Sequence, residues 1–248
     1  MALLGRVLLI TAAAGIGGTG MGGLTACLFR RDSSRAVSLL LSFAAGVMVA
    51  VVCFDLLADA VSPDGGRLWL TAPGILLGCG ATGILNALIG RRAGRNEGLF
   101  LAGLVMAAAI ALHNVPEGMV IGASFAREPE ESALPRGGLL MAAVIGLHNI
   151  PEGMAVAVPL ISGGMGRSRA AAAAALTGAP TVLGALLGFS LGTLGPTALA
   201  LALSFASGAM LYVVFGELLP EAARMWRGRA PAAAAVLGII VGMVIVYA

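Results

Sequence analysis

The sequence contains the stretch LHNVPEGM at residues 112–119, which returns almost unchanged as LHNIPEGM at residues 147–154. Each copy lies inside a long apolar run whose only charged residue is the glutamate of the motif, and the two histidines of the chain both belong to it. One His–Glu pair in an apolar run could be a hydrogen-bonded packing device. Because ionisable groups are costly there, two copies that use every histidine favour a functional site.

In a helix, residues four positions apart lie on one face, so His113 is expected beside Glu117 and His148 beside Glu152. Imidazole and carboxylate groups are ligands of zinc- and iron-type ions. If the two helices face each other, they can supply four ligands to one ion. We therefore predict a metal site between the two copies of the motif.

The asparagine and proline of the motif add to this prediction. Asn114 and Asn149 lie on the adjoining side of their helices and are further candidate ligands. Pro116 and Pro151 lack an N–H, so the carbonyl group four residues earlier loses its helical partner. We expect each helix to kink there and to leave a carbonyl oxygen for a ligand or water.

The composition places this motif in a membrane protein. Of the 248 residues, 59% are hydrophobic and 11% are charged, and the mean hydropathy is +0.99. Soluble domains carry about a quarter charged residues. Apolar runs of about 20 residues can span the hydrocarbon layer, and the chain has eight of them. We predict an all-α integral membrane protein with a single transmembrane domain, residues 1–248, whose helices lie at about 3–28, 37–60, 69–90, 99–125, 137–161, 169–192, 197–220 and 231–247.

The arginines predict the orientation. All the basic side chains are arginine, and they lie in short clusters between the runs, which is typical of membrane topology rather than of a nucleic-acid surface. Eleven arginines fall on one side of the membrane and four on the other. By the positive-inside rule the side with eleven faces the cytoplasm. We therefore expect a multi-pass protein of the cell (inner) membrane with both termini external. The cytoplasmic set is Arg30, Arg31, Arg35, Arg91, Arg92, Arg95, Arg167, Arg169, Arg224, Arg227 and Arg229, and the external set is Arg6, Arg67, Arg127 and Arg136.

A second internal repeat relates the second and seventh runs. Residues 43–48 (FAAGVM) match residues 205–210 (FASGAM), 162 positions later. An odd number of crossings separates these runs, as it does the fourth and fifth, so each matched pair is antiparallel. Inverted-topology repeats of this kind flank the substrate site near the midplane of many transporters.

The second repeat carries weaker candidate residues. Met48 and Met210 occupy equivalent positions, although methionine in an apolar run is usually a packing residue. Asp55 and Glu217 are also equivalent. They are either solvated carboxylates at the interface or acids that attract cations at the two mouths of a pathway.

With these motifs the chain resembles the ZIP family of zinc and iron permeases. The carrying residues are His113 to Gly118 and His148 to Gly153, on what the family has as its fourth and fifth helices, and the eight runs cover the chain in the family's pattern. The resemblance implies uptake of divalent metal into the cytoplasm and a 3+2+3 helix arrangement. Helices 1, 4, 5 and 6 would move against helices 2, 3, 7 and 8, commonly within a homodimer.

The resemblance also implies a ligand set. The family's primary site corresponds to Met48, His113, Glu117, His148 and Glu152. Some members hold a second ion, bridged by the two glutamates. Here Asn149 stands where those members have aspartate, and Thr181 where they have glutamate. We therefore expect any second ion to bind weakly.

Two other functions are alternatives to metal transport. An intramembrane metallohydrolase would place glutamate directly after the first histidine in an H-E-x-x-H motif, which the sequence lacks. A proton-coupled carrier of organic substrates could use the His–Glu pairs as relays. We expect a transporter rather than an enzyme, with no prosthetic group. Its cargo would be zinc first, with iron, manganese, cobalt and cadmium also compatible with the donor set.

Overall fold

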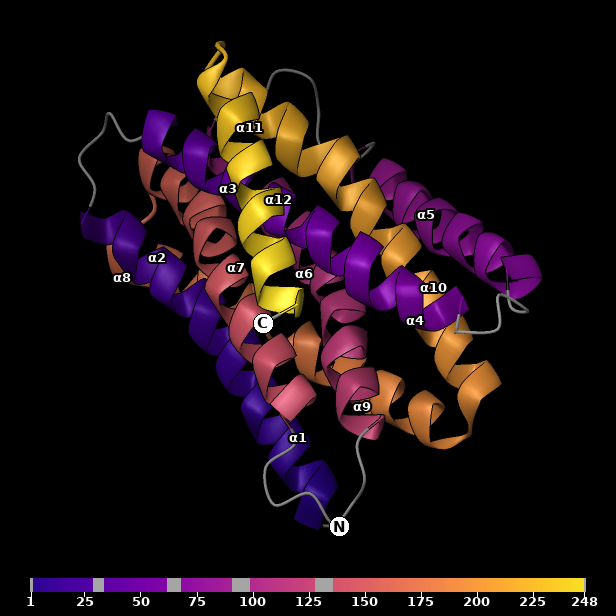
Figure 1. Cartoon of the computed structure of the whole chain (residues 1–248). Coiled ribbons are helices and arrows are strands. Elements are labelled where there is room, and N and C mark those ends of the chain that lie inside the picture. Colours follow the sequence, from indigo (N-terminus) through magenta and orange to yellow (C-terminus); the bar gives the residue numbers. More distant parts are fainter. Residues whose placement is uncertain (1, 29–33, 62–67, 91–98, 128–135, 248) are drawn as a thin grey trace.

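The computed structural model describes residues 2–28, 34–61, 68–90, 99–127 and 136–247, and every regular element among them is a helix (Figure 1). Seven helical stretches in this part of the chain are long and apolar enough to cross a membrane. The helix α6, Leu99–Ala126, has 28 residues, or about 42 Å, and is an eighth by length. The predicted all-α membrane class is confirmed. Of the arginines used for orientation, Arg30, Arg31, Arg67, Arg91, Arg92 and Arg95 lie outside the described residues.

Several of the predicted spans consist of more than one helical element. The first span is α1 (Ala2–Ala12), η1 (Ala13–Gly17) and α2 (Gly18–Leu28), and the second is α3 (Ser34–Val51), η2 (Val52–Leu56) and α4 (Leu57–Val61). The third is α5 (Leu68–Gly90), the fourth is α6, and the fifth is α7 (Arg136–Ser162). The sixth is α8 (Arg167–Thr177) with α9 (Pro180–Thr193), the seventh is α10 (Pro196–Val213), η3 (Val214–Leu218) and α11 (Leu219–Met225), and the eighth is α12 (Ala230–Tyr247).

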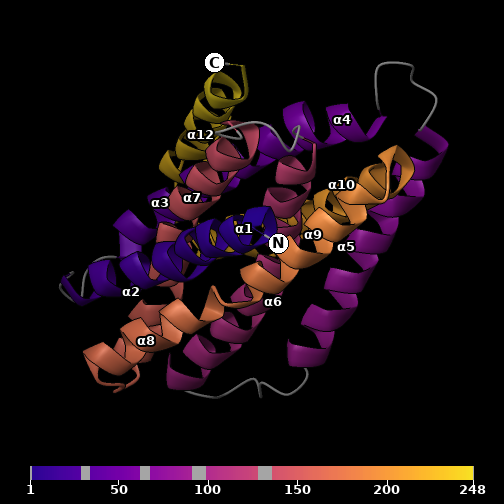
Figure 2. The ribbon, with the colours of Figure 1, turned by 90° about the horizontal axis from the view of Figure 1, so that it is seen from below.

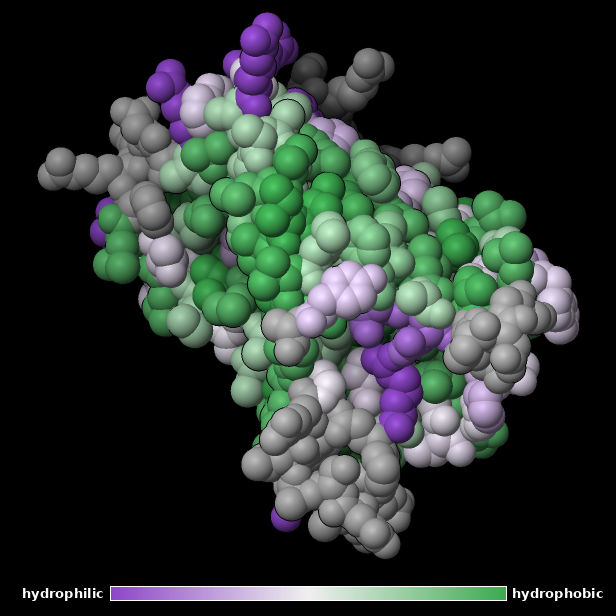
Figure 3. All heavy atoms as spheres, viewed as in Figure 1, coloured by the Kyte–Doolittle hydropathy of each residue, from purple (hydrophilic) through white to green (hydrophobic). Residues whose placement is uncertain are grey.

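The surface between the helix ends is apolar. Large aliphatic side chains such as Leu76, Leu187 and Val244 are exposed on α5, α9 and α12. Figure 3 shows hydrophobic side chains covering the middle of one face, with hydrophilic ones gathered mainly toward its ends. Such a surface is stable in contact with lipid rather than water.

The helices pack into two groups. One contains α1, η1, α2, α6, α7, α8 and α9, and the other contains α3, η2, α4, α5, α10, η3, α11 and α12. Contacts are more extensive within each group than between them, and α6 on α9 and α3 on α12 are the largest pairs. Figure 2 shows α12 beside α3 on one flank and α5 beside α10 on another. The two groups meet where α10 contacts α6 and α3 contacts α7.

Glycines bring the helices of each group into backbone contact. A Cβ atom on Gly118 of α6 would collide with the carbonyl oxygen of Thr181, and one on Gly184 of α9 would collide with that of Val115. In lipid, helices associate through such close approaches because no hydrophobic effect drives them together. The residue next to Glu117 is therefore packed directly against α9.

Two π-helical segments lie at equivalent positions of the second repeat. The segments η2 and η3 begin at Val52 and Val214, 162 positions apart, as are the motifs that precede them. Each contains the acid of its repeat, Asp55 or Glu217. π-Helical turns occur mostly at functional positions and rotate the residues that follow. The repeat in the sequence is therefore also a repeat of an unusual backbone conformation.

The sixth span differs from the single helix predicted at 169–192. The chain forms a tight turn at Gly178 and Ala179, whose N–H groups bond to carbonyls only three residues earlier, and a new helix starts at Pro180. Proline has no N–H for the preceding turn and is favoured at the first helical position. The helix therefore divides there into α8 and α9. By contrast, α6 and α7 continue through Pro116 and Pro151.

Candidate metal centre

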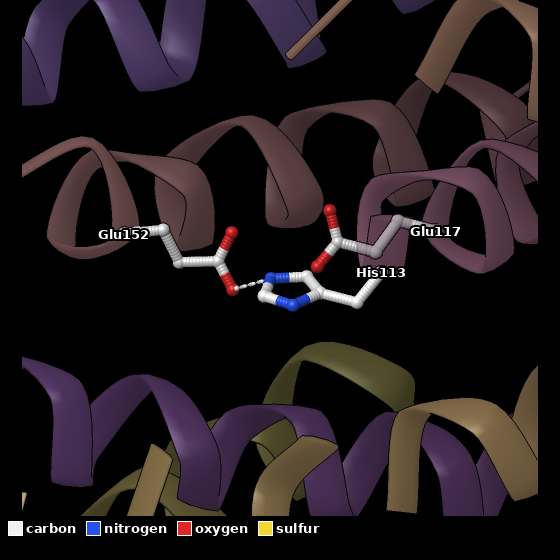
Figure 4. A group of neighbouring side chains, drawn as sticks. All are labelled: His113, Glu117 and Glu152. Atoms are coloured by element: carbon white, nitrogen blue, oxygen red, sulfur yellow. Dashed lines mark hydrogen bonds and ion pairs between the residues drawn. The ribbon is translucent and has the colours of Figure 1, made fainter. Parts of the chain in front are cut away.

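The two copies of the histidine motif face each other on α6 and α7. These helices are antiparallel, because Gly138 lies against Phe125 at one end and Gly163 against Phe100 at the other. Figure 4 shows Glu152 of α7 pointing toward His113 and Glu117 of α6. Nε2 of His113 is 2.9 Å from Oε1 of Glu152. The structure thus pairs His113 with Glu152 across the helix interface and also keeps it near Glu117 of its own helix, as the sequence predicted.

The second histidine joins the same carboxylate. Nε2 of His148 is 3.0 Å from Oε1 of Glu152, one turn along α7 as predicted, and 3.5 Å from Oε1 of Glu117. Both imidazole rings therefore converge on one carboxylate oxygen. Glu117 lies on the other side of the cluster, within the 4.8 Å that also encloses ligand atoms of His113 and Glu152.

These distances fit the geometry of a tetrahedral cation. A zinc ion with nitrogen and oxygen ligands at 2.0–2.1 Å holds those ligands about 3.4 Å apart. Three contacts of the cluster lie around this value: His113 to Glu152 at 2.9 Å, His148 to Glu152 at 3.0 Å and His148 to Glu117 at 3.5 Å. The ligand atoms of His113, Glu117 and Glu152 all lie within 4.8 Å of one another, so these three side chains could hold one ion, with His148 beside them.

The electrostatics of the cluster also fit a cation. All four side chains are buried, and Glu117 and Glu152 are fully so. Among the described residues, neither oxygen of Glu117 has a hydrogen-bond partner, nor has Oε2 of Glu152. Because an unpaired carboxylate is costly in a low-dielectric interior, these oxygens are strong acceptors for a positive charge.

The asparagines of the motif bind the backbone of neighbouring helices. Nδ2 of Asn114 donates to the carbonyl of Thr177 at 2.6 Å, and Nδ2 of Asn149 donates to that of Ala14 at 3.3 Å. Thr177 ends α8 and Ala14 lies in η1, so both acceptors are where a helix is irregular. In the described part of the molecule, the two Oδ1 atoms have no partner. The amides therefore fix the motif in place and leave their oxygens available beside the carboxylates.

Thr181 lies at the start of α9, directly after the break in the sixth span. Its side chain is fully buried, and its Oγ1 has no hydrogen-bond partner among the described residues. Thr181 is neutral, as is Asn149, so neither residue adds negative charge to the two glutamates.

Met48 of α3 faces the cluster from the other group of helices. It is 4% exposed and lines a small cavity together with Glu117 and His148. Only the family resemblance implied that Met48 is a ligand, and the structure places it next to Glu117 and His148.

Of the two acids of the second repeat, Glu217 lies close enough to the cluster to interact electrostatically with His113 and Glu152. Asp55 is half-buried in η2, with one carboxylate oxygen 3.6 Å from the guanidinium of Arg127, which also contacts Asp59. Glu217 is half-buried in η3. The sequence analysis gave Arg127 no role beyond topology. Arg127 directly follows the helix that carries the first histidine motif. This position in the sequence is the signal that could have suggested a role for it.

Comparison with known proteins identifies the family. The family model described as ZIP Zinc transporter matches residues 91–248, more than half of the chain. The chain is 32% identical to "Zinc transporter ZupT" of Akkermansia muciniphila and 34% identical to that of Chlorobium luteolum, in both cases over 96% of this chain and 94% of the relative. "Zinc transporter GufA" of Myxococcus xanthus is 41% identical over 49% of this chain and 46% of its own length.

These matches agree with the motif and with the fold. The family consists of membrane transporters, so the chain is a multi-pass metal transporter and not an enzyme. The resemblance inferred from the histidine motifs is confirmed, and the chain belongs to the ZIP zinc transporter family.

Proposed function

We propose that this protein carries zinc and related divalent ions inward across the cell (inner) membrane, with both termini external. The observation that carries the proposal is the convergence of His113, His148, Glu117 and Glu152 in a buried cluster between α6 and α7. The names of the relatives, which are called zinc transporters, support zinc as the cargo.

The ion would bind first to the carboxylates and imidazoles of this cluster. Asn114 and Asn149 would add amide oxygens, and Met48 a thioether. The oxygens of Glu117 accept no hydrogen bond among the described residues, and this supports the assignment because a cation would supply them with a close partner. Asp55 and Glu217, in the matched π-helical segments, would attract the ion at the outer and cytoplasmic ends of the pathway.

Movement would take place between the two groups of helices. In the 3+2+3 arrangement, helices 1, 4, 5 and 6 shift as a unit against helices 2, 3, 7 and 8, within a homodimer embedded in the lipid bilayer. The packing supports this division. The same helices form the two groups described above, and contacts within each group are more extensive than contacts between the groups. The asparagine and glycine contacts tie the motif helices to α9 and to the first span, so the ligands would travel with their own group.

Uptake into proteoliposomes tests the proposal. Purified protein is reconstituted with a zinc-sensitive dye inside the vesicles, and zinc is added outside. We expect saturable uptake by the unmodified protein and none by Glu117→Gln at equal amounts of inserted protein. Equal uptake by both would remove the cluster from the transport path, and uptake of an organic solute that a chelator leaves unchanged would overturn metal transport itself.

A further inference from the structure

A small cavity lies at the contact between the two groups of helices. Its volume is about 10 Å³, close to what one water-sized sphere occupies. Every side chain around it is buried. The cavity is lined by Val47, Met48, Val51, Glu117, Val144, Ile145, His148 and Met210.

The two sides of the cavity differ in chemistry. Glu117 of α6 and His148 of α7 line the cavity from one group of helices. Met48 of α3 and Met210 of α10 contribute two thioethers from the other, and they are 4% and 2% exposed. The remaining side chains are aliphatic. The heteroatom-bearing side chains of the lining are therefore those of Glu117, His148, Met48 and Met210.

The two methionines are related by the second internal repeat. Met48 ends residues 43–48 and Met210 ends residues 205–210, and each lies four residues before a π-helical segment. They lie on different helices, α3 and α10, yet both line the same small cavity. A packing role alone would be served as well by leucine, which fills such a space with better-defined rotamers.

We propose that Met210 is a second sulfur ligand at this cavity and that, with Met48, it selects soft and borderline divalent ions. The proposal rests on the proposed function. An ion here would take its charge compensation from Glu117, whose oxygens have no hydrogen-bond partner among the described residues. Thioether sulfur favours ions such as Cd²⁺ and Zn²⁺ over Mn²⁺ and Mg²⁺, which prefer oxygen. Met210 would therefore determine specificity rather than transport as such.

X-ray absorption at the cadmium edge counts the sulfur ligands directly. The purified protein is loaded with one equivalent of Cd²⁺, and the number of sulfur neighbours is measured for the unmodified protein, Met48→Leu, Met210→Leu and the double variant. We expect two, one, one and none. Met141→Leu is the matched control, because Met141 is a buried methionine of α7 that does not line the cavity, and it should leave the count at two.

The same variants are compared in uptake. Met210→Leu should retain zinc uptake but lose about fivefold to tenfold of its preference for Cd²⁺ over Mn²⁺. Should Met210→Leu fail to insert, the unmodified protein still decides the question through ¹³C-methyl spectra of its 11 methionines. Two methyl signals must then shift when Cd²⁺ is added.

A sulfur count below two in the unmodified protein, or one that Met210→Leu does not lower, overturns the proposal. So does a shift of fewer than two methyl signals. In each case normal zinc uptake by the unmodified protein would leave the proposed function standing. Absence of zinc uptake by the unmodified protein would instead remove the proposed function.

Discussion

The guanidinium of Arg127, directly after α6, lies 3.6 Å from the carboxylate of Asp55 in η2. It also contacts Asp59 one turn later, and its Nη2 donates to Ser124 at 2.9 Å. Arg127 belongs to the helix that carries the first histidine motif, and the two acids belong to the other group of helices. This ion pair therefore joins the two groups at one end of the molecule, at the proposed outer mouth.

Removing Arg127 should make this mouth more attractive to cations. Arg127→Gln leaves Asp55 and Asp59 without their basic partner, so we expect KM for zinc to fall about twofold to fivefold, in line with ion pairs worth at most about 1 kcal/mol at partly exposed positions. Asp55→Asn should raise KM. Both effects should fade as salt rises to physiological strength, because screening acts over about 8–10 Å.

The matched control is Arg224→Gln. Arg224 also pairs with a carboxylate, that of Glu221 on the same helix, but at the opposite end of the molecule. It should leave KM for external zinc unchanged. A salt-independent loss of maximal rate in Asp55→Asn would instead place Asp55 in direct contact with the ion.

Loss of a central ligand should abolish transport without unfolding the protein. Glu117→Gln and His148→Ala each remove one metal ligand from the buried cluster, and a loss of about 3 kcal/mol of binding free energy corresponds to a factor of more than about 100 in affinity. We expect uptake to fall at least about 100-fold. Unchanged elution in size-exclusion chromatography would establish that the variants are folded, and wild-type rates in either variant would contradict the assignment.

Zinc should stabilise the folded protein, and a chelator should reverse this. At a zinc concentration 100 times Kd, binding to the native state alone adds about 2.7 kcal/mol to the free energy of unfolding. We expect a rise in Tm that disappears on adding a chelator and is absent in Glu117→Gln. An equal rise in Glu117→Gln would mean that zinc stabilises the protein from elsewhere.

Packing at Gly118 should tolerate no side chain. In Gly118→Ala the new Cβ atom would meet the carbonyl of Thr181, so we expect a loss of about 1–3 kcal/mol in stability. Gly80→Ala is the control, since nothing lies within 4 Å of a Cβ atom there, and alanine is the better helix former. Thermal unfolding in detergent compares the two, and equal Tm values for both variants would argue against the close α6–α9 contact.

Acids placed beside the glutamates should create a second ion site. Asn149 and Thr181 are neutral, so a second divalent ion lacks the charge needed to offset cation repulsion. Asn149→Asp with Thr181→Glu supplies it. Asn149 donates a hydrogen bond to the carbonyl of Ala14, and an aspartate at this position would face that carbonyl without a proton to donate. The double variant should therefore be less stable without metal. Anomalous diffraction should find one central ion per protomer in the unmodified protein and two in the variant. Two fully occupied ions in the unmodified protein at low metal would refute the argument.

The helical class, the apolar spans and the meeting of the two histidine motifs could be predicted from the sequence. Spans follow from composition and length, and the spacing of His148 and Glu152 places them on one face of α7. The pairing of His113 with Glu152 could not be predicted, because it depends on how α6 and α7 are offset along their common contact. Periodicity within a helix contains no information on that offset.

The irregular backbone was also missed, for two different reasons. The break at Gly178 to Pro180 had a local signal in its glycine and proline, which the long apolar run obscured. The segment η2 has little local signal, since it contains neither glycine nor proline, whereas η3 contains Gly216. What the two segments share in the sequence is the repeat at an offset of 162 residues. That both copies adopt a π-helical backbone can be seen only in the structure.

The backbone contact at Gly118 has a consequence for anyone wishing to re-engineer the ion preference. Glu117 is followed by Gly118, where any side chain would collide with the carbonyl of Thr181. The α6 side of the site therefore offers little room for substitution. The opposite wall, formed by Met48 of α3 and Met210 of α10, consists of flexible side chains around a space that is still open. Libraries that vary these two positions and keep the motif untouched are the economical route to a transporter with a different choice of metal.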